Sequence, residues 1–178
     1  MNSLPFEGAD IFPWALTCTN NVAATDALRP VHIPDLSMEA VASSMPPNGL
    51  SMAAGDFDEV YSAEPQRSQF DCVATCFFID TTHSVLRTID TIFHCLRPGG
   101  VWANVGPLLY HWADAGSYLG TDETSVEPSL EEVLSYASSK GFIILSYDGA
   151  RECGYGDNVR SMMRTRYRCA AWAMRKPE

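Results

Sequence analysis

The amino-acid sequence predicts an α/β fold, the C-terminal half of a doubly wound sheet that is mostly parallel and has an antiparallel last strand. From residue 70 onward, apolar strand segments alternate with amphipathic helical segments, and strands joined through a helix pair in parallel. The last strand segment follows its predecessor without a helix, which favours antiparallel pairing. With 178 residues and 46% hydrophobic side chains, the chain is large enough for one domain with a core.

The first strand and helix lie in the middle of the chain. Phe70–Ile79 is nearly all apolar, a pattern typical of a strand buried on both faces. A helix over about residues 83–96 would turn one apolar stripe toward the core, formed by Val85, Ile89, Ile92 and Leu96. Pro98-Gly99-Gly100 would end this helix, and Val101–Val105 is the next strand.

A second helix is predicted by a capping box, with Ser129 as N-cap and Glu132 at the third helical position. Its core-facing stripe consists of Leu130, Val133, Leu134 and Ala137, and Gly141 suits the residue after its end. Strands are predicted at Phe142–Tyr147 and Tyr167–Met174, separated by an irregular segment over residues 148–163.

The N-terminal part differs in composition from the rest. Residues 1–50 are rich in proline, serine and asparagine, which predicts an irregular lead-in with a short strand at Val31–Ile33. The strand and helix core would occupy residues 51–178 and begin with a short strand at Ser51–Ala54. We expect residues 1–178 to form one partial domain.

Charge and composition narrow the classes of partner. The net charge is −10, which argues against nucleic acid and anionic membranes, because both attract clustered lysine and arginine. Neither a signal peptide nor an apolar run long enough for a membrane span is evident, so we expect a cytosolic protein, with the nucleus as a second compartment. A late basic cluster suits a solvated strand edge or, less well, a carboxylate or phosphate site; it comprises Arg160, Arg164, Arg166, Arg168, Arg175 and Lys176.

Six cysteines are present, without a C-x-x-C pair. Cys72 and Cys76 lie four residues apart in a predicted strand and would therefore point to the same face. Buried thiols in a reducing compartment explain this usage better than a disulfide framework. A thiol–imidazole pair of Cys76 with His83 is disfavoured, because Cys76 is expected to be buried and buried thiols are usually inert.

A candidate site follows from the order of the strands. Asp80 and His111 each come just after one of two strands predicted to be parallel neighbours, and ligands bind at the carboxyl ends of such strands. Asp80 could instead cap the following helix, as could Thr81 or Thr82, and His111 could be an ordinary surface residue.

Other motifs carry less weight. Gly154-Tyr155-Gly156 follows no predicted strand and opens no helix, so it is interpreted as a turn rather than a nucleotide loop. The four histidines have no spacing typical of metal ligands, and no metal is expected; they are His32, His83, His94 and His111.

Several long strings resemble the carnosine N-methyltransferase family. They are SMAAGDF, FDCVATCFFIDTTH, the IDTI of the first helix, LRPGGVWANVGPLLYH and NVRSMMRTRYRC; FPW, Asn20-Asn21 and Asp26–Pro30 fit as well. The resemblance runs from about residue 11 to the end, with gaps around 37–48 and 112–128.

The resemblance implies a class I Rossmann-like methyltransferase fold, S-adenosyl-L-methionine as cofactor, and methylation of an imidazole nitrogen of the dipeptide carnosine to give anserine. Asp56 and Phe57 would contact the adenine end of the cofactor, and Cys76 would lie beside it. Three residues would hold the substrate imidazole: Asp80, His111 and Tyr167. A carboxylate such as Asp80 would accept the N–H of one ring nitrogen and leave the lone pair of the other aimed at the methyl group.

The chain also departs from that family. The family's Gly-rich cofactor loop and its ribose-binding acidic residue would lie upstream of residue 1, and Thr165 stands where a tyrosine is usual. We therefore expect a truncated gene product or one part of a longer protein, inactive alone, in which the strand at 70–79 has one exposed edge. A non-catalytic pseudoenzyme or interaction module, a related enzyme acting on a peptide histidine, and a homodimer remain open alternatives.

Overall fold

The computed structural model describes residues 8–33, 41, 43–46, 49–113 and 125–178. The chain divides into two compact units. Unit 1 comprises residues 1–53 and 154–165, and unit 2 comprises residues 54–153 and 166–178. Residues 154–165, expected to be an irregular part of the core region, thus group with the N-terminal lead-in.

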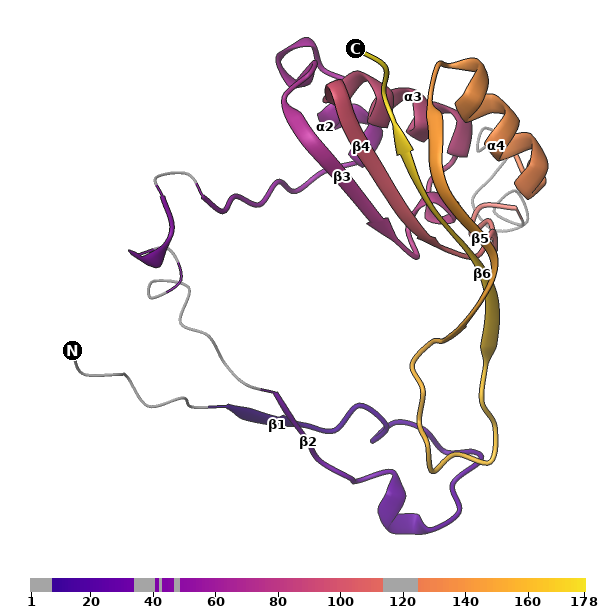
Figure 1. Ribbon diagram of the computed structural model, residues 1–178. Helices are drawn as coiled ribbons and strands as arrows, with labels where there is room; N and C mark the ends of the chain where they lie inside the picture. Colours follow the sequence, from indigo (N-terminus) through magenta and orange to yellow (C-terminus); the bar gives the residue numbers. More distant parts are fainter. Residues whose placement is uncertain (1–7, 34–40, 42, 47–48, 114–124) are drawn as a thin grey trace. The chain divides into compact units, whose positions relative to one another are not determined.

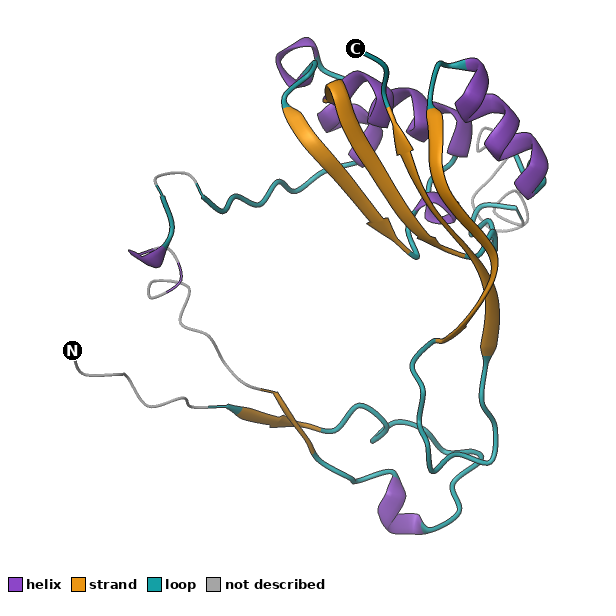
Figure 2. Cartoon of the chain, in the orientation of Figure 1, coloured by secondary structure: helices purple, strands orange, loops and turns teal. Residues whose placement is uncertain are grey.

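Unit 2 contains a four-stranded sheet in the order β3-β4-β6-β5 (Figures 1 and 2). Its strands are β3 (Phe70–Cys76), β4 (Leu96–Gly106), β5 (Ile143–Gly154) and β6 (Arg166–Arg175). β3 and β4 pair in parallel, with Cys72 opposite Val101, and β4 pairs antiparallel with β6, with Trp102 opposite Met174. The predicted α/β class, the parallel pair and the antiparallel last strand are confirmed.

The helices of unit 2 begin where their sequences provide caps. They are α2 (Phe57–Tyr61), α3 (Val85–Cys95) and α4 (Leu130–Ser139), with short 3-10 turns η2 (Glu64–Gln66) and η3 (Ile79–Thr81). The Ser84 hydroxyl accepts the Arg87 N–H at the start of α3, and the predicted Ser129–Glu132 capping box starts α4. Gly141 follows α4 with φ +108, as expected for a residue after a helix end.

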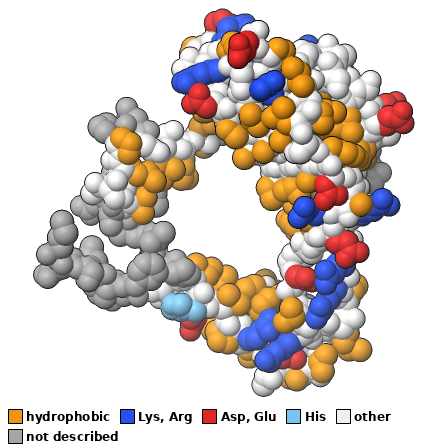
Figure 3. Space-filling model, viewed as in Figure 1, with side chains coloured by type: hydrophobic (Ala, Val, Ile, Leu, Met, Phe, Trp, Pro, Cys, Tyr) orange, Lys and Arg blue, Asp and Glu red, His pale blue; other side chains and the backbone are white. Residues whose placement is uncertain are grey.

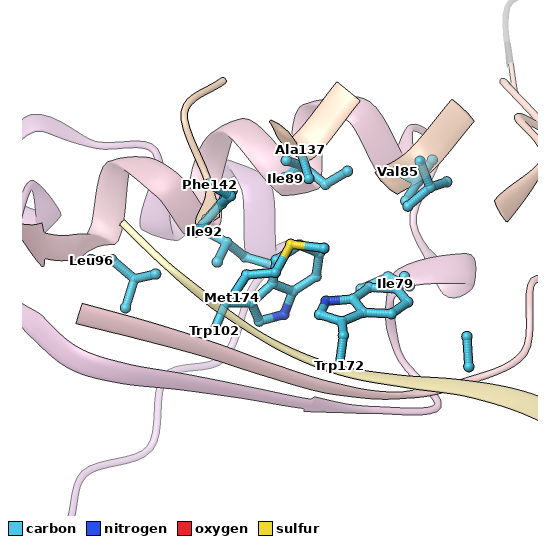
Figure 4. Close-up of a cluster of buried hydrophobic side chains, with 12 residues drawn as sticks. Ile79, Val85, Ile89, Ile92, Leu96, Trp102, Ala137, Phe142, Trp172 and Met174 are labelled. Carbon is cyan, nitrogen blue, oxygen red and sulfur yellow. The ribbon is translucent and has the colours of Figure 1, made fainter. Parts of the chain in front are cut away.

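The core lies between one face of the sheet and the helices α3 and α4. Figure 4 shows Trp102, Trp172 and Met174 on the sheet beneath Ile89 of α3 and Ala137 of α4. The predicted helix stripes are confirmed: Val85, Ile89, Ile92, Val133 and Ala137 are buried, and Leu130 and Leu134 pack against this cluster. Leu96, predicted as the last member of the first stripe, is also buried but belongs to β4. Burying such side chains is the main source of stability for a domain of this size.

The opposite face of the sheet is open among the described residues. Cys72, Ala74 and Cys76 of β3 are exposed there, so the prediction that this strand is buried on both faces is wrong. The physical reason is the position of β3 at the edge of the sheet, with α3 and α4 on the other face. Figure 3 shows hydrophobic side chains reaching the surface of the molecule. The edge position agrees with the exposed edge expected from the sequence.

Several element boundaries differ from the sequence predictions; β3, for example, ends at Cys76 rather than at Ile79. β4 begins at Leu96, directly after α3, and runs through Pro98-Gly99-Gly100, where Gly99 has φ +79 and the register with β3 shifts. The helix therefore ends before Pro98, because a proline disfavours the helical conformation in the residue that precedes it. β5 extends to Gly154, into the segment predicted to be irregular, and Ser51–Ala54 is not a strand.

Unit 1 contains a small β-hairpin and a loop that is held by side-chain hydrogen bonds. β1 (Ala9–Ile11) pairs antiparallel with β2 (Val31–Ile33), and η1 (Ala24–Asp26) lies between them. Arg160 donates to the buried Asp26 carboxylate at 3.0 Å, and Arg29 donates to Asn158 at 3.3 Å.

Several members of the late basic cluster have structural partners rather than forming only a solvated strand edge, among them Arg164, which donates to the Val159 carbonyl. Arg160 binds Asp26, and the Lys176 ammonium donates to the carbonyls of Phe93 and Leu96 at the end of α3. Within the described ranges, no helix is both long and apolar enough to cross a bilayer.

The capping box predicts a specific stability difference. Replacing Ser129 by alanine should lower the free energy of unfolding by about 1 kcal/mol, because it leaves N–H groups at the start of α4 without an acceptor. Ser138→Ala, on the same helix, should cost less, because the exposed Ser138 hydroxyl only donates to a carbonyl that is already in the helix. Urea unfolding of both variants measures the difference, and equal losses would contradict the capping assignment.

Candidate active site

The end of β3 forms a tight turn that carries Asp80. Phe77 leaves the strand with φ 49, a left-handed conformation unusual for an aromatic residue, and its N–H donates to the Val105 carbonyl at 2.8 Å. Gly106 makes this approach feasible, because a Cβ there would lie 3.2 Å from the Phe77 backbone. η3 then buries Asp80, which is 2% exposed.

The loop after β4 is bound directly to Asp80. The Leu109 N–H donates to Asp80 Oδ2 at 2.8 Å, and the His111 N–H donates to the Asp80 carbonyl at 2.9 Å. The His111 ring adds a third contact, with Nδ1 3.2 Å from the same carbonyl oxygen. The structure therefore brings Asp80 and His111 together at the carboxyl ends of the parallel strands, where sequence order predicted them.

These contacts bear on the alternatives left open for the two residues. Asp80 does not cap α3, since Ser84 is the N-cap, so the capping interpretation is wrong. His111 is exposed, as a surface residue would be, yet its ring is oriented by Asp80. Because a carbonyl oxygen can only accept, this bond places the proton on Nδ1 and leaves the Nε2 lone pair of the neutral ring available.

Sequence reasoning assigned no role to two further aromatic residues beside this turn and loop, Trp112 and Tyr110. Trp112 donates from Nε1 to the Thr81 carbonyl at 2.9 Å and stacks on His83 with ring centroids 3.6 Å apart. Tyr110 has φ 35 and donates to the Pro128 carbonyl at 2.6 Å, and its burial raises the pKa of its hydroxyl above the usual range. Backbone strain of this kind at Phe77 and Tyr110 is typical of functional sites.

The other predicted substrate residue, Tyr167, lies near the start of β6. Its ring contacts Phe77 edge to face, with centroids 5.7 Å apart, and Phe77 precedes the turn that holds Asp80. Tyr167 is half-buried. The edge-to-face contact links β6 to the same turn and leaves the phenol at the end of the sheet where Asp80 and His111 lie.

Cys76 ends β3 on the open face of the sheet and is exposed, so its predicted burial is wrong. In the described part of the chain all six cysteines are free thiols; Cys95 and Cys169 are buried, Cys153 is half-buried, and the others are exposed. Burial, aided by a hydrogen bond with Cys153 and by the charge of Asp80, raises the pKa of Cys169 to about 11. Cys169 therefore stays a thiol at neutral pH.

Asp56 and Phe57, the predicted cofactor residues, open α2. Asp56 caps the helix by accepting the Glu59 N–H at 3.0 Å. The Phe57 ring lies edge to face on Phe78, with centroids 5.1 Å apart, and lines an apolar cavity of about 290 Å³. That cavity is lined by Phe57, Tyr61, Phe70, Cys72, Val73 and Cys95. An aromatic cavity of this kind suits a planar ring such as adenine.

The Gly154-Tyr155-Gly156 motif has a clear outcome. Gly154-Tyr155-Gly156 does follow a strand, contrary to the prediction, because β5 extends to Gly154. Gly156 has φ +59 and the segment leads into turns rather than a helix, so its interpretation as a turn stands. No cluster of three potential metal ligands occurs in the part of the chain that the structure describes.

Comparison with known proteins finds one family. Residues 6–178 match the family model for carnosine N-methyltransferase. Proteins named carnosine N-methyltransferase from Rattus norvegicus and Schizosaccharomyces pombe are each 39% identical, over 169 and 171 residues. The matches cover 94% and 93% of this chain but 39% and 44% of the relatives, so the chain spans about two-fifths of the length of these curated relatives.

Solved structures with similar folds are more distant. The N-methyltransferase NodS from Bradyrhizobium japonicum, in complex with S-adenosyl-L-homocysteine, is 16% identical, with a TM-score of 0.44 over 74% of this chain and 56% of that one. An S-adenosylmethionine-dependent methyltransferase from Mesorhizobium loti is 14% identical, with a TM-score of 0.47 over 80% and 78%. These scores are too low to carry an argument about the site.

The placement of the thiols can be tested by alkylation of the native protein. Cys72 and Cys76 should react with iodoacetamide in the native protein, because both thiols are exposed. Cys95 and Cys169 should react only after unfolding, because burial raises the pKa of each thiol to about 11. Peptide mass spectrometry distinguishes the sites, and protection of Cys76 equal to that of Cys95 would contradict an open face.

Proposed function

The chain belongs to the carnosine N-methyltransferase family, and from this premise we propose that it serves S-adenosylmethionine-dependent methylation of an imidazole nitrogen. The substrate would be carnosine, giving anserine, or a related histidine-containing compound. The observation that supports this most is the binding of the loop after β4 to Asp80, which holds a carboxylate and His111 side by side at the carboxyl ends of two parallel strands.

Asp80 would orient the substrate ring. A carboxylate accepts several hydrogen bonds, so the Leu109 N–H on Oδ2 leaves capacity for the N–H of an imidazole. Accepting that proton fixes the tautomer and leaves the lone pair of the other nitrogen free to attack. The negative charge also stabilises the positive charge that develops on the ring, and the buried position of Asp80 strengthens the effect.

His111 and Tyr167 would complete the substrate site. With Nδ1 directed at the Asp80 carbonyl, His111 can accept a hydrogen bond at Nε2, for example from the ammonium group of a dipeptide. Tyr167 can share the hydrogen bond to the ring. No strong base is required, because the proton leaves after transfer, and positioning alone can lower the barrier by roughly 7–11 kcal/mol.

Asp56, Phe57 and Cys76 would hold the adenosine part of the cofactor. The aromatic cavity at Phe57 fits a flat ring, and the exposed end of β3 at Cys76 leaves room beside the substrate residues. When bound, S-adenosylmethionine supplies an electrophilic methyl group on sulfur. The residues present account for the adenine end of such a ligand, whereas the sequence has no Gly-rich loop at a strand–helix junction.

A second candidate function is a non-catalytic interaction module that keeps this fold. The specific observation in its favour is the exposed edge and open face of β3, an apolar strand that carries no lysine or proline to protect it. Binding of S-adenosylmethionine separates the two candidates, because a module without a cofactor site would not bind it.

Removing the charge of Asp80 should abolish most of the methyl transfer. Asp80→Asn keeps an oxygen for the Leu109 N–H but cannot stabilise a cationic ring, so the rate with carnosine should fall by about 10²–10³-fold. Asp90→Asn is the matched control, since Asp90 binds Tyr136 and Lys140 on the outer side of α3. The assay follows anserine by mass spectrometry, and equal rates in the two variants would refute the role of Asp80.

Cofactor affinity should depend on Phe57. Calorimetric titration with S-adenosylmethionine should show binding to the wild type, weakened about tenfold in Phe57→Ala by the loss of ring contact. Phe12→Ala removes a phenylalanine that is 49% exposed in unit 1 and should leave the affinity unchanged. Absence of binding to the wild type would favour the non-catalytic module.

A further inference from the structure

One buried carboxyl group lies outside the proposed site. Asp58 is 5% exposed, although its neighbours Asp56 and Glu59 on the same short helix are exposed. Its Oδ2 lies 3.0 Å from the hydroxyl oxygen of Thr88, which is fully buried on α3. Its Oδ1 is buried and has no hydrogen-bond partner among the described residues. Such a group is costly unless something compensates for its burial.

The contact continues beyond Thr88. The Thr88 and Thr82 hydroxyl oxygens lie 2.8 Å apart, and the Thr82 hydroxyl donates to the Ile79 carbonyl at 3.1 Å. Ile79 begins η3, the turn that carries Asp80. Three side chains therefore connect the start of α2, with Asp56 and Phe57, to the turn of the substrate site.

The number of protons in this network is decisive. The Thr88 hydroxyl has one proton but lies within hydrogen-bonding distance of three oxygens: Asp58 Oδ2, Thr82 Oγ1 and the Ser84 carbonyl. If Asp58 is ionised, the Thr88 proton must serve its carboxylate, and the Thr82 proton can then serve either Thr88 or the Ile79 carbonyl but not both, so one link is left without a hydrogen bond. If Asp58 is protonated, it donates to Thr88, Thr88 donates to Thr82, and Thr82 donates to Ile79, so that every link is a hydrogen bond.

We propose that Asp58 is a positioning residue, which acts through Thr88 and Thr82 to hold the start of α2 in register with the Asp80 turn. α2 has five residues, too few to be stable by itself, so its place depends on contacts such as this one and the Phe57–Phe78 ring contact. An effect of Asp58 on catalysis rests on the proposed function. The connection between α2 and the Asp80 turn rests only on the contacts described above.

Burial is the main effect on the titration of Asp58. Burial raises the pKa of its carboxyl group above the ordinary value, and the nearby Asp56 charge raises it further. The nearby hydroxyl groups of Thr91 and Thr88 and the charge of Arg87 act in the opposite direction without reversing the shift. The stability that this protonation contributes is therefore full below the unfolded-state pKa and is lost as pH rises through the folded-state pKa.

Thr88→Val tests the connection with little change in volume, and Thr88→Ser restores the hydroxyl group. Hydrogen exchange followed by mass spectrometry should show about tenfold faster exchange in Thr88→Val for residues 57–61 and 79–82. Exchange in α4 should be unchanged, and Thr88→Ser should resemble the wild type. Faster exchange everywhere, or in α2 alone, would overturn the proposal.

The protonation of Asp58 can be tested separately. Asp58→Asn supplies an amide N–H that can donate to Thr88 at every pH, so it mimics the protonated acid. Between pH 4 and pH 7, the wild type should lose stability relative to Asp58→Asn in urea unfolding, and the protection of residues 79–82 should fall only in the wild type. A parallel pH dependence in both proteins would refute protonation of Asp58.

A titration with S-adenosylmethionine separates this inference from the proposed function. If both are right, Thr88→Val should weaken binding about tenfold and Thr88→Ser should restore it. If the wild type does not bind the cofactor, the proposed function fails, and the exchange measurements still decide whether Asp58 positions the turn. If the wild type binds S-adenosylmethionine and Thr88→Val binds it equally well, the contacts of Asp58, Thr88 and Thr82 do not affect the cofactor site, and this part of the inference is refuted.

Discussion

The parallel pairing of β3 with β4 is the constraint on which the site depends. Because both strands run in the same direction, the residues that follow them emerge at the same edge, and the Phe77 N–H bond to Val105 fixes their ends together. The Leu109 N–H then donates to the buried Asp80 carboxylate, and the His111 N–H donates to the Asp80 backbone carbonyl, so the loop after β4 is bound to the turn after β3. Burial of Asp80 without these donors would be costly.

Patterns with a single physical cause were predicted well. The apolar stripes of α3 and α4, the Ser129 capping box and the neighbouring positions of Asp80 and His111 follow from helical periodicity, cap chemistry and the direction of parallel strands. Each depends on residues close in sequence or on one topological rule. The roles of Asp56, Phe57, Cys76 and Tyr167 came from resemblance and stay predictions.

Features that depend on distant partners could not be predicted. Nothing local marks Phe77 or Tyr110 for a left-handed backbone, since aromatic residues rarely adopt it, and only the contact across to Val105 or Pro128 explains each case. The exposure of Cys76 was missed because an apolar strand resembles a central one even when it lies at an edge. The burial of Asp58 could likewise not be predicted from the sequence, because a charged residue on a short helix usually faces water.

The place of β6 in the sheet has a consequence for how the chain acquires its structure. β4 and β5 are not hydrogen-bonded neighbours; β6 lies between them and supplies Trp172 and Met174 to the core. During synthesis, β3, α3, β4, α4 and β5 leave the ribosome before the strand that joins them. The sheet therefore closes only after β6 has been synthesised, and until then the unpaired edges of β4 and β5 are exposed to chaperones and to other nascent chains.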